Sequence, residues 1–291
     1  MLLELAGRHP LLRNSPTTRT ACDRLVLDAR RLLFASPLDL AAAAASAHLH
    51  ADDGTPTALV LPRSPDVTSY LQRMDLITAL PNGTHIEGDL PDETRKDQSL
   101  NLLEVTHLRP DTVGRISEQL GRLTLHHLGP RNGRRVCQGI GELIDNAIDH
   151  GASTCGAFIA AQAYSGKTTG YRRLEIAVCD TGVGVLDHLR RNPRHRLLSS
   201  SAAALERALQ RGASGTEDKR GNGLPDLLTS SGATAATRLV LRSGDGLLRA
   251  GRHRGRGASV THSFPTAMVI RGTWSWLRVS YRTKPTCASM N

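Results

Sequence analysis

The segment from Glu142 to Gly151, Glu-Leu-Ile-Asp-Asn-Ala-Ile-Asp-His-Gly, constrains the fold of this chain more than any other feature. Its apolar residues recur at helical spacing, so Glu142, Asn146 and His150, each four residues apart, share the opposite side of a helix. A carboxylate can orient or deprotonate a nucleophile, and an amide oxygen suits Mg2+, which keeps several waters and bridges phosphates. Taken alone, the segment fits equally well with an amphipathic helix whose polar side is only solvated.

A second segment joins a strand pattern to a glycine-containing turn. Residues 173–179 alternate apolar and polar side chains as a half-buried strand does, and they lead directly into Asp180-Thr-Gly182-Val-Gly184. A carboxylate at a strand end can accept a hydrogen bond from an exocyclic amine such as adenine N6. The two glycines permit a close approach of a ligand to the backbone. A tight turn capped by Asp180 is the alternative.

A third segment, residues 219–228, is a glycine-rich stretch that leads into a short apolar helix. The exposed amide groups at such a helix start, together with nearby cationic side chains, favour an anion site. A glycine hinge before a helix is the alternative. The residues of interest in this segment are Lys219, Arg220, Gly221, Asn222, Gly223 and Leu224.

In this order, the three segments resemble the N, G1 and G2 boxes of the GHKL superfamily, named for gyrase B, Hsp90, histidine kinases and MutL. The resemblance covers about residues 110–283. It implies an α/β fold of the Bergerat type, a sandwich in which an antiparallel sheet binds ATP beneath helices and a mobile lid. ATP and Mg2+ are the cofactors that this resemblance implies.

The resemblance also implies roles for individual residues. It assigns Glu142 as the catalytic general base, Asn146 as the ligand of Mg2+ and Asp180 as the adenine-binding residue. The Gly272-Thr273 pair, which precedes a predicted final strand at residues 274–281, resembles the Gly-Thr pair of the family, in which the hydroxyl assists adenine recognition. Packing against a neighbour is the alternative for His150. The nucleotide-binding residues implied are Asn146, Asp149, His150, Asp180, Gly182, Gly184, Lys219, Arg220, Gly221, Asn222, Gly223, Leu224 and Thr273.

The residues between the second and third segments, 186–220, correspond to the expected lid. Their first part is basic, and its arginines could meet phosphates or form a solvated loop. Three serines, 199–201, precede a predicted helix over 202–211, and we expect them to cap it because a serine at a helix entrance satisfies free amide groups.

The amino-terminal third predicts a separate small α/β unit over residues 21–105, followed by the nucleotide-binding unit over 106–291. Its arrangement resembles STAS-type domains, although no serine stands at a phosphorylatable position of that pattern. We expect a loose arm at residues 1–20, strands at 24–28 and 57–61, helices at 38–48 and 66–80, and a polar connector at 81–98.

The charge and the aromatic content of the chain bear on which partners it could bind. The net charge of +10 comes from arginine, since only four of the 37 basic residues are lysine, and aromatic residues make up 3%. Arginine is scattered and few aromatic residues could stack on bases, so nucleic-acid binding is disfavoured. We expect a flexible hairpin tip at 251–257, with contact to an acidic partner as the alternative.

Neither a secretory signal nor an apolar run of about 18–20 residues is present in the sequence, so we expect no membrane span. The five cysteines are far apart and odd in number, which favours reduced thiols in a cytoplasmic protein.

Neither His107 nor the His126-His127 pair is followed by an acidic residue, so the phosphoacceptor box of a sensor histidine kinase is not indicated. Small serine kinases of the anti-sigma type share the Glu-x-x-x-Asn arrangement. We therefore expect an ATP-binding regulatory protein that hydrolyses ATP or phosphorylates a protein partner, with a homodimer possible. A nucleotide-gated protein-binding module with little turnover is the alternative, and an arginine-rich ATPase associated with nucleic acid is a third.

Overall fold

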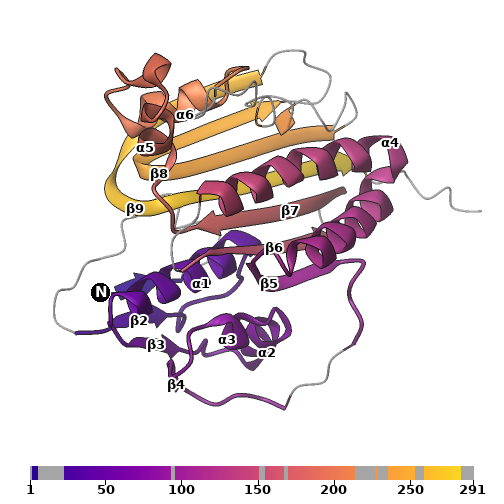
Figure 1. The fold of residues 1–291 in the computed structure, drawn as a ribbon. Helices are drawn as coiled ribbons and strands as arrows, with labels where there is room; N and C mark the ends of the chain where they lie inside the picture. Colours follow the sequence, from indigo (N-terminus) through magenta and orange to yellow (C-terminus); the bar gives the residue numbers. More distant parts are fainter. Residues whose placement is uncertain are drawn as a thin grey trace, which may run out of the picture.

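The computed structural model describes residues 2–5, 23–92, 96–150, 155–166, 170–213, 224, 227–228, 235–252 and 259–282. It contains a four-stranded parallel sheet of order β1-β2-β3-β4 and a five-stranded antiparallel sheet of order β5-β6-β7-β9-β8 (Figure 1). This mixed architecture, with a smaller amino-terminal α/β unit before a larger antiparallel sheet with helices, confirms the fold class expected from the sequence.

The parallel sheet alternates strands and helices as the sequence predicts. In chain order, the strands of this sheet and the helices between them are β1 (Leu2–Glu4), β2 (Leu25–Asp28), α1 (Pro37–Asp52), β3 (Thr57–Val60), α2 (Pro65–Arg73), α3 (Leu76–Ala79) and β4 (His85–Glu87).

Three features of the parallel sheet differ from the sequence expectation. Residues 2–4, expected in a loose arm, form β1 beside β2, because Leu3 and Leu5 are buried in the core. The polar connector contains β4. The helix expected over 66–80 divides into α2 and α3 at Asp75, whose φ of 56° is incompatible with a continuous right-handed helix.

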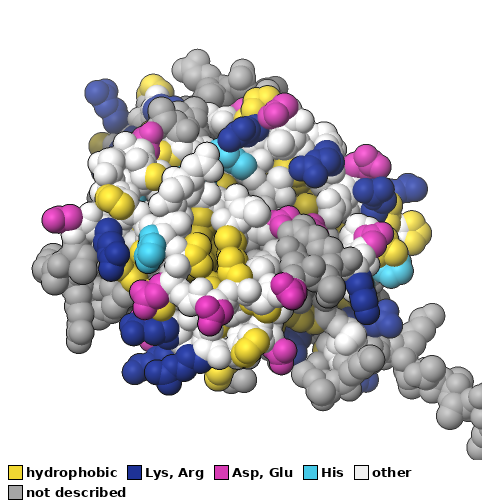
Figure 2. Space-filling model, turned by 90° about the horizontal axis from the view of Figure 1, so that it is seen from below, with side chains coloured by type: hydrophobic (Ala, Val, Ile, Leu, Met, Phe, Trp, Pro, Cys, Tyr) yellow, Lys and Arg dark blue, Asp and Glu magenta, His cyan; other side chains and the backbone are white. Residues whose placement is uncertain are grey.

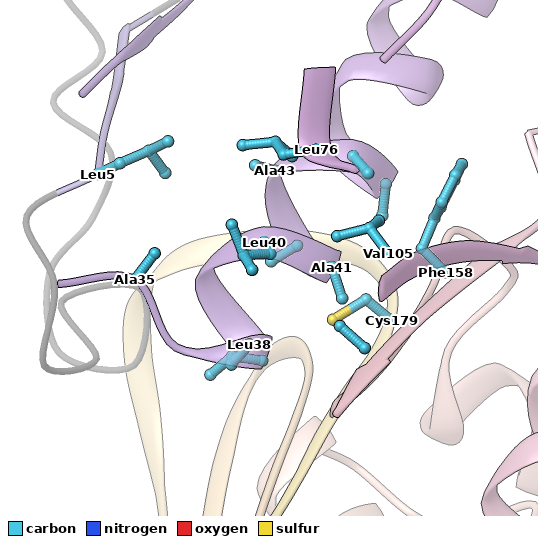
Figure 3. Packing of buried hydrophobic residues seen from close by; sticks show 14 of the residues in the cluster. Leu5, Ala35, Leu38, Leu40, Ala41, Ala43, Leu76, Val105, Phe158 and Cys179 are labelled. Carbon is cyan, nitrogen blue, oxygen red and sulfur yellow. The ribbon is translucent and has the colours of Figure 1, made fainter. Parts of the chain in front are cut away.

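Helix α1 is buried along most of its length because small side chains allow neighbours to approach from several sides. A capping box of Ser36 and Asp39 starts the helix, and Pro37 occupies its first turn. All eleven residues from Pro37 to Ala47 are buried. The apolar cluster around α1 contains residues of both sheets, so this helix lies between them (Figure 1). Figure 3 labels Leu38, Leu40, Ala41 and Ala43 of α1 near Phe158 and Cys179 of the antiparallel sheet.

Charged groups are buried where α1 covers the antiparallel sheet. The Glu175 carboxylate pairs with the Arg278 guanidinium at 2.8 Å and accepts a hydrogen bond from the Trp276 ring N–H at 3.4 Å. Burial raises the pKa of Glu175 despite the attraction of Arg278. Asp39 is also buried, which raises its pKa to about 6, and the nearby charge of Glu175 adds to that shift. The face of the sheet beneath α1 therefore combines an apolar core with a buried ion pair.

The antiparallel sheet consists of β5 (Leu102–Leu108), β6 (Ala157–Tyr164), β7 (Tyr171–Asp180), β8 (Ala235–Arg252) and β9 (Ser259–Arg282). The strand expected at 274–281 is thus the second half of a longer strand. Alternate residues face opposite sides: Phe158 and Cys179 pack with α1, while Ile159 and Val178 pack with α4 (Val113–His150).

Helix α4 has two arms. Gly129, with φ 75° and ψ 169°, breaks the helix before Pro130. The arms then pack closely, since a Cβ on Gly133 would lie 2.8 Å from the Thr124 carbonyl oxygen. The second arm buries Ile140 and Ile144 together with Val136, Leu143 and Ala147 against the sheet, which confirms the helical spacing predicted from the sequence.

The lid segment is described up to residue 213. It contains α5 (Val185–Arg190), a short 3-10 helix (Pro193–His195) and α6 (Ser201–Ala208). The Ser200 hydroxyl accepts a hydrogen bond from the Ala203 amide at 3.2 Å, which confirms the expected serine cap. The lid arginines 190, 191, 194 and 196 are exposed.

The side formed by the amino-terminal unit is seen in Figure 2, where apolar side chains gather near the centre and acidic and basic ones surround them. No helix among the described residues combines the length and the apolar character needed to cross a membrane.

Candidate functional site

The carboxylate of Asp180, the last residue of β7, is the centre of the candidate site. Only 7% of this residue is exposed. Its Oδ1 accepts hydrogen bonds from the Gly182 amide at 2.9 Å and the Thr273 amide at 3.1 Å. Strand alternation places Asp180 on the same face as Ile176 and Val178, which is the face covered by α4. The structure thus brings together Asp180, Gly182 and Thr273, three of the residues to which the resemblance assigns nucleotide binding.

Burial raises the pKa of Asp180 to about 6, while the hydrogen bonds from Gly182 and Thr273 act in the opposite direction. Both of these hydrogen bonds end on Oδ1. Within the described part of the chain, Oδ2 is therefore the oxygen left to accept from an external donor. A buried carboxylate held in this way suits one specific N–H donor better than a hydrated cation.

Two glycines let the chain pass close to Asp180 and to Ser243. Gly272 has φ +82°, and a Cβ there would lie 2.1 Å from the backbone oxygen of Asp180. Gly184 has φ +81°, and its Cβ would lie 2.8 Å from the Ser243 hydroxyl. Only glycine adopts such a conformation easily, and only glycine fits in this space. The backbone geometry therefore requires glycine at both positions, whereas the proposed role of Gly184 in nucleotide binding stays a prediction.

Ser243 of β8 joins the two glycine turns. Its hydroxyl donates to the Gly272 carbonyl at 2.9 Å and accepts from the Val185 amide at 2.9 Å, so it connects β9 to the start of α5. The sequence interpretation missed this residue. Its position directly before Gly244, at the end of the apolar and arginine run 238–242, is the sequence signal that could have indicated it.

The turn after Asp180 is also fixed to Gly156, the residue before β6. The Thr181 hydroxyl donates to the Gly156 carbonyl at 3.0 Å. Gly156 has φ +70°, and its Cβ would lie 2.1 Å from Nε2 of His107. The His107 ring stacks on Phe158, with 4.6 Å between ring centroids, and burial together with the charge of Arg109 lowers the pKa of His107 to about 4. A neutral imidazole thus supports the turn that follows Asp180.

The predicted residues of α4 occupy the second arm of that helix. Glu142, Asn146 and Asp149 are exposed there, on the side away from the buried apolar stripe. The backbone of His150 ends the helix, and its side chain lies outside the described residues. Among the described residues, no hydrogen bond or ion pair joins Glu142 or Asn146 to the Asp180 turn, so their roles stay predictions.

The third segment is described only in part. Lys219, Arg220, Gly221, Asn222 and Gly223 lie outside the described residues. Leu224 is partly buried and packs with the cluster between α4 and the sheet, and Leu227 belongs to the same cluster. A Cβ on Gly139 would lie 2.3 Å from Leu227, so the chain after the glycine-rich segment runs directly against α4. Leu227, near the end of the third segment, thus approaches α4 three residues before the first segment begins.

Among the residues that the structure describes, no three His, Cys, Asp or Glu side chains are grouped as a metal site.

Neither a family model nor a curated protein matches the sequence. Among solved structures, the chain is similar to a topoisomerase IV ATP-binding domain of Francisella tularensis in complex with a small-molecule inhibitor, at 16% identity. The match covers 63% of this chain and 42% of that chain, with a TM-score of 0.27. So coarse a likeness leaves the functional argument to the residues around Asp180.

Proposed function

We propose that this chain is an ATP-binding regulatory protein of the GHKL type. The buried Asp180 carboxylate supports this most strongly, because it is fixed through Oδ1 by two backbone amides and keeps Oδ2 for an outside donor. An exocyclic amine such as adenine N6 is a donor of the required kind. Residues 106–291 would form the nucleotide-binding unit, and residues 21–105 a small unit packed on its other face.

The second arm of α4 would supply the chemistry. Asn146 would hold Mg2+, which neutralises phosphate charge, and Glu142 would orient or deprotonate the nucleophile. The nucleophile is water in an ATPase and a side-chain hydroxyl of a protein partner in a kinase. Both side chains are exposed, so a nucleophile from solvent or from a partner can reach them.

Adenine recognition is tested by replacing Asp180 with asparagine and titrating the protein with Mg2+ and ATP in a calorimeter. Asp180→Asn keeps one acceptor oxygen but loses the charge and adds an N–H group, so we expect at least about a tenfold weaker Kd, or about 1.4 kcal/mol. The matched control is Asp66→Asn, the same change at an exposed position of α2, which should bind as the parent does. Equal affinity in both variants would reject the adenine assignment.

Turnover is tested separately with labelled ATP. Glu142→Gln should retain nucleotide but lose turnover by about 100-fold to 10,000-fold, the usual contribution of a general base. Glu118→Gln, an exposed glutamate on the first arm of α4, is the control. Asn146→Ala should weaken binding only when Mg2+ is present. Label on free phosphate indicates an ATPase, and label on a protein indicates a kinase. ATP binding without either would favour the nucleotide-gated binding module.

A further inference from the structure

Strands β8 and β9 continue as a pair beyond the rest of the antiparallel sheet. β7 pairs with β9 only between Trp274 and Arg282, whereas β8 pairs with β9 as far as Arg252 and Ser259. We refer to residues 246–252 and 259–265, which form this extension, as the β-arm.

One face of the β-arm is covered. Leu248 and Ala250 are buried in the cluster that also contains Leu205 of α6. The Ser263 hydroxyl donates a hydrogen bond to the Glu206 carboxylate of the same helix. In Figure 1, α6 lies beside β8 on this part of the sheet.

The other face of the β-arm mixes apolar and basic side chains; it is exposed at Arg249, Val260, His262 and Phe264 and buried only at Leu247, the partner of Phe264. Register pairs Arg249 with His262, and it places Val260 and Phe264 on either side of that pair on the same face. The Arg249 guanidinium lies 5.3 Å from the centroid of the Phe264 ring, which confirms that the two side chains share this face. Val260 is 49% exposed and Phe264 37%. Apolar, basic and apolar groups thus follow one another along the β-arm at intervals of roughly 6.6–6.8 Å.

The sequence of the hairpin that contains the β-arm is basic. From Gly246 to Pro265 it contains four arginines and no acidic residue. An opposite charge would be steered to this surface.

We propose that the open face of the β-arm is a docking surface for an extended acidic segment of a partner protein in which carboxylate and apolar side chains alternate along one face. Arg249 would pair with a carboxylate, and the flanking Val260 and Phe264 would bury apolar side chains of that segment. The exposed Val260 favours a protein over a nucleic acid, because an aliphatic side chain neither pairs with phosphates nor stacks on bases. This inference uses no property of the nucleotide site and stands or falls independently of ATP binding.

The test is fluorescence anisotropy of the full chain with a fluorescein-labelled 12-residue peptide that repeats Leu-Ser-Glu-Ser. In an extended peptide this repeat places leucine and glutamate alternately on one face, at the spacing of the β-arm. Two further probes are a peptide of equal charge that repeats Ser-Ser-Glu-Ser and a 16-base-pair DNA duplex. We expect the leucine peptide to bind most tightly of the three.

Arg249→Ala and Phe264→Ala should each weaken binding of the leucine peptide by about tenfold, as central contact residues do. Val260→Ser, at the most exposed apolar position of the face, should also weaken it and guards against misfolding of the phenylalanine variant. Arg238→Ala, an exposed arginine of β8 far from the β-arm, should change the affinity less than about twofold. Equal binding of both peptides, or affinity that none of the β-arm substitutions changes, would overturn the proposal. Tighter binding of DNA that depends on Arg249 but not on Phe264 would also overturn it, in favour of a nucleic-acid surface.

Discussion

Replacement of Gly272 by alanine perturbs the approach of β9 to Asp180 at its narrowest point. The new Cβ would lie 2.1 Å from the Asp180 backbone oxygen and 2.8 Å from its Oδ1. The residue would also have to keep φ near +82°. We expect β9 to shift away, so that the Thr273 amide no longer reaches the carboxylate.

Two costs add in this variant. A side chain in the left-handed region costs about 1–2 kcal/mol. Crowding of a packed interior adds about 1–3 kcal/mol. The free energy of unfolding of Gly272→Ala should therefore fall by about 2–5 kcal/mol. Gly83 separates the two costs, because it has φ +84° but no atom within 4 Å of its ideal Cβ. The free energy of unfolding of Gly83→Ala should fall by only about 1–2 kcal/mol.

Both variants are compared with the parent by urea denaturation and by thermal unfolding. For a chain of this size, 1 kcal/mol corresponds to roughly 2–4 °C in Tm. Gly272→Ala should thus unfold roughly 2–12 °C below Gly83→Ala, and it should bind ATP less tightly. If the two alanine variants were equally stable, the close contact between β9 and Asp180 would be absent in solution, and the account of the site would have to be abandoned.

Other predictions concern the buried charges and helix α4. Because burial raises the pKa of Asp180 and of Asp39 to about 6, the folded chain retains protons that the unfolded chain releases near pH 4. The free energy of unfolding should therefore decrease as pH rises from about 4 to about 6, and Asp180→Asn or Asp39→Asn should each flatten this decrease in urea titrations. Arg278→Met should lower the free energy of unfolding by about 3–5 kcal/mol, because it leaves Glu175 buried without its partner. Adding Glu175→Gln should recover part of that loss. A double variant no more stable than Arg278→Met alone would refute the pairing. Gly141→Ala should raise the free energy of unfolding by about 0.5–1 kcal/mol and therefore raise Tm. Gly141 lies within α4, and no atom lies within 4 Å of its ideal Cβ. A lower Tm would contradict the helical second arm.

Local pattern was sufficient to predict the elements whose side chains follow one period. The buried stripe of Ile140 and Ile144 lies where helical spacing placed it, and β3 lies within the apolar run predicted to form it. The three-residue strands β1 and β4 are too short to show alternation. They exist because neighbouring strands offer hydrogen bonds and a core, which no local pattern encodes.

The candidate site shows the same limit. The positions of Asp180, Gly182 and Thr273 agree with the ordered motifs, since each motif carries its own local geometry. Ser243 could not be predicted, because its function depends on the meeting of β8 with a turn of β9 and with α5, 29 and 58 residues away in the chain. Contacts of this kind depend on strand pairing over long distances, and the length of β9 before Trp274 likewise emerges only from its pairing with β8.

The burial of α1 on both sides has a consequence for the order in which the chain can fold during its synthesis. This helix ends at Asp52, but β6 and β7, which cover one of its sides, are complete only at Asp180. At about 5–20 residues per second, ribosomes need roughly 6–26 s to make the intervening residues. During that time an alanine-rich, apolar helix surface has no sheet to cover it in the emerging chain. The amino-terminal unit made alone should consequently aggregate, and newly made chains should depend on chaperones until β7 has emerged.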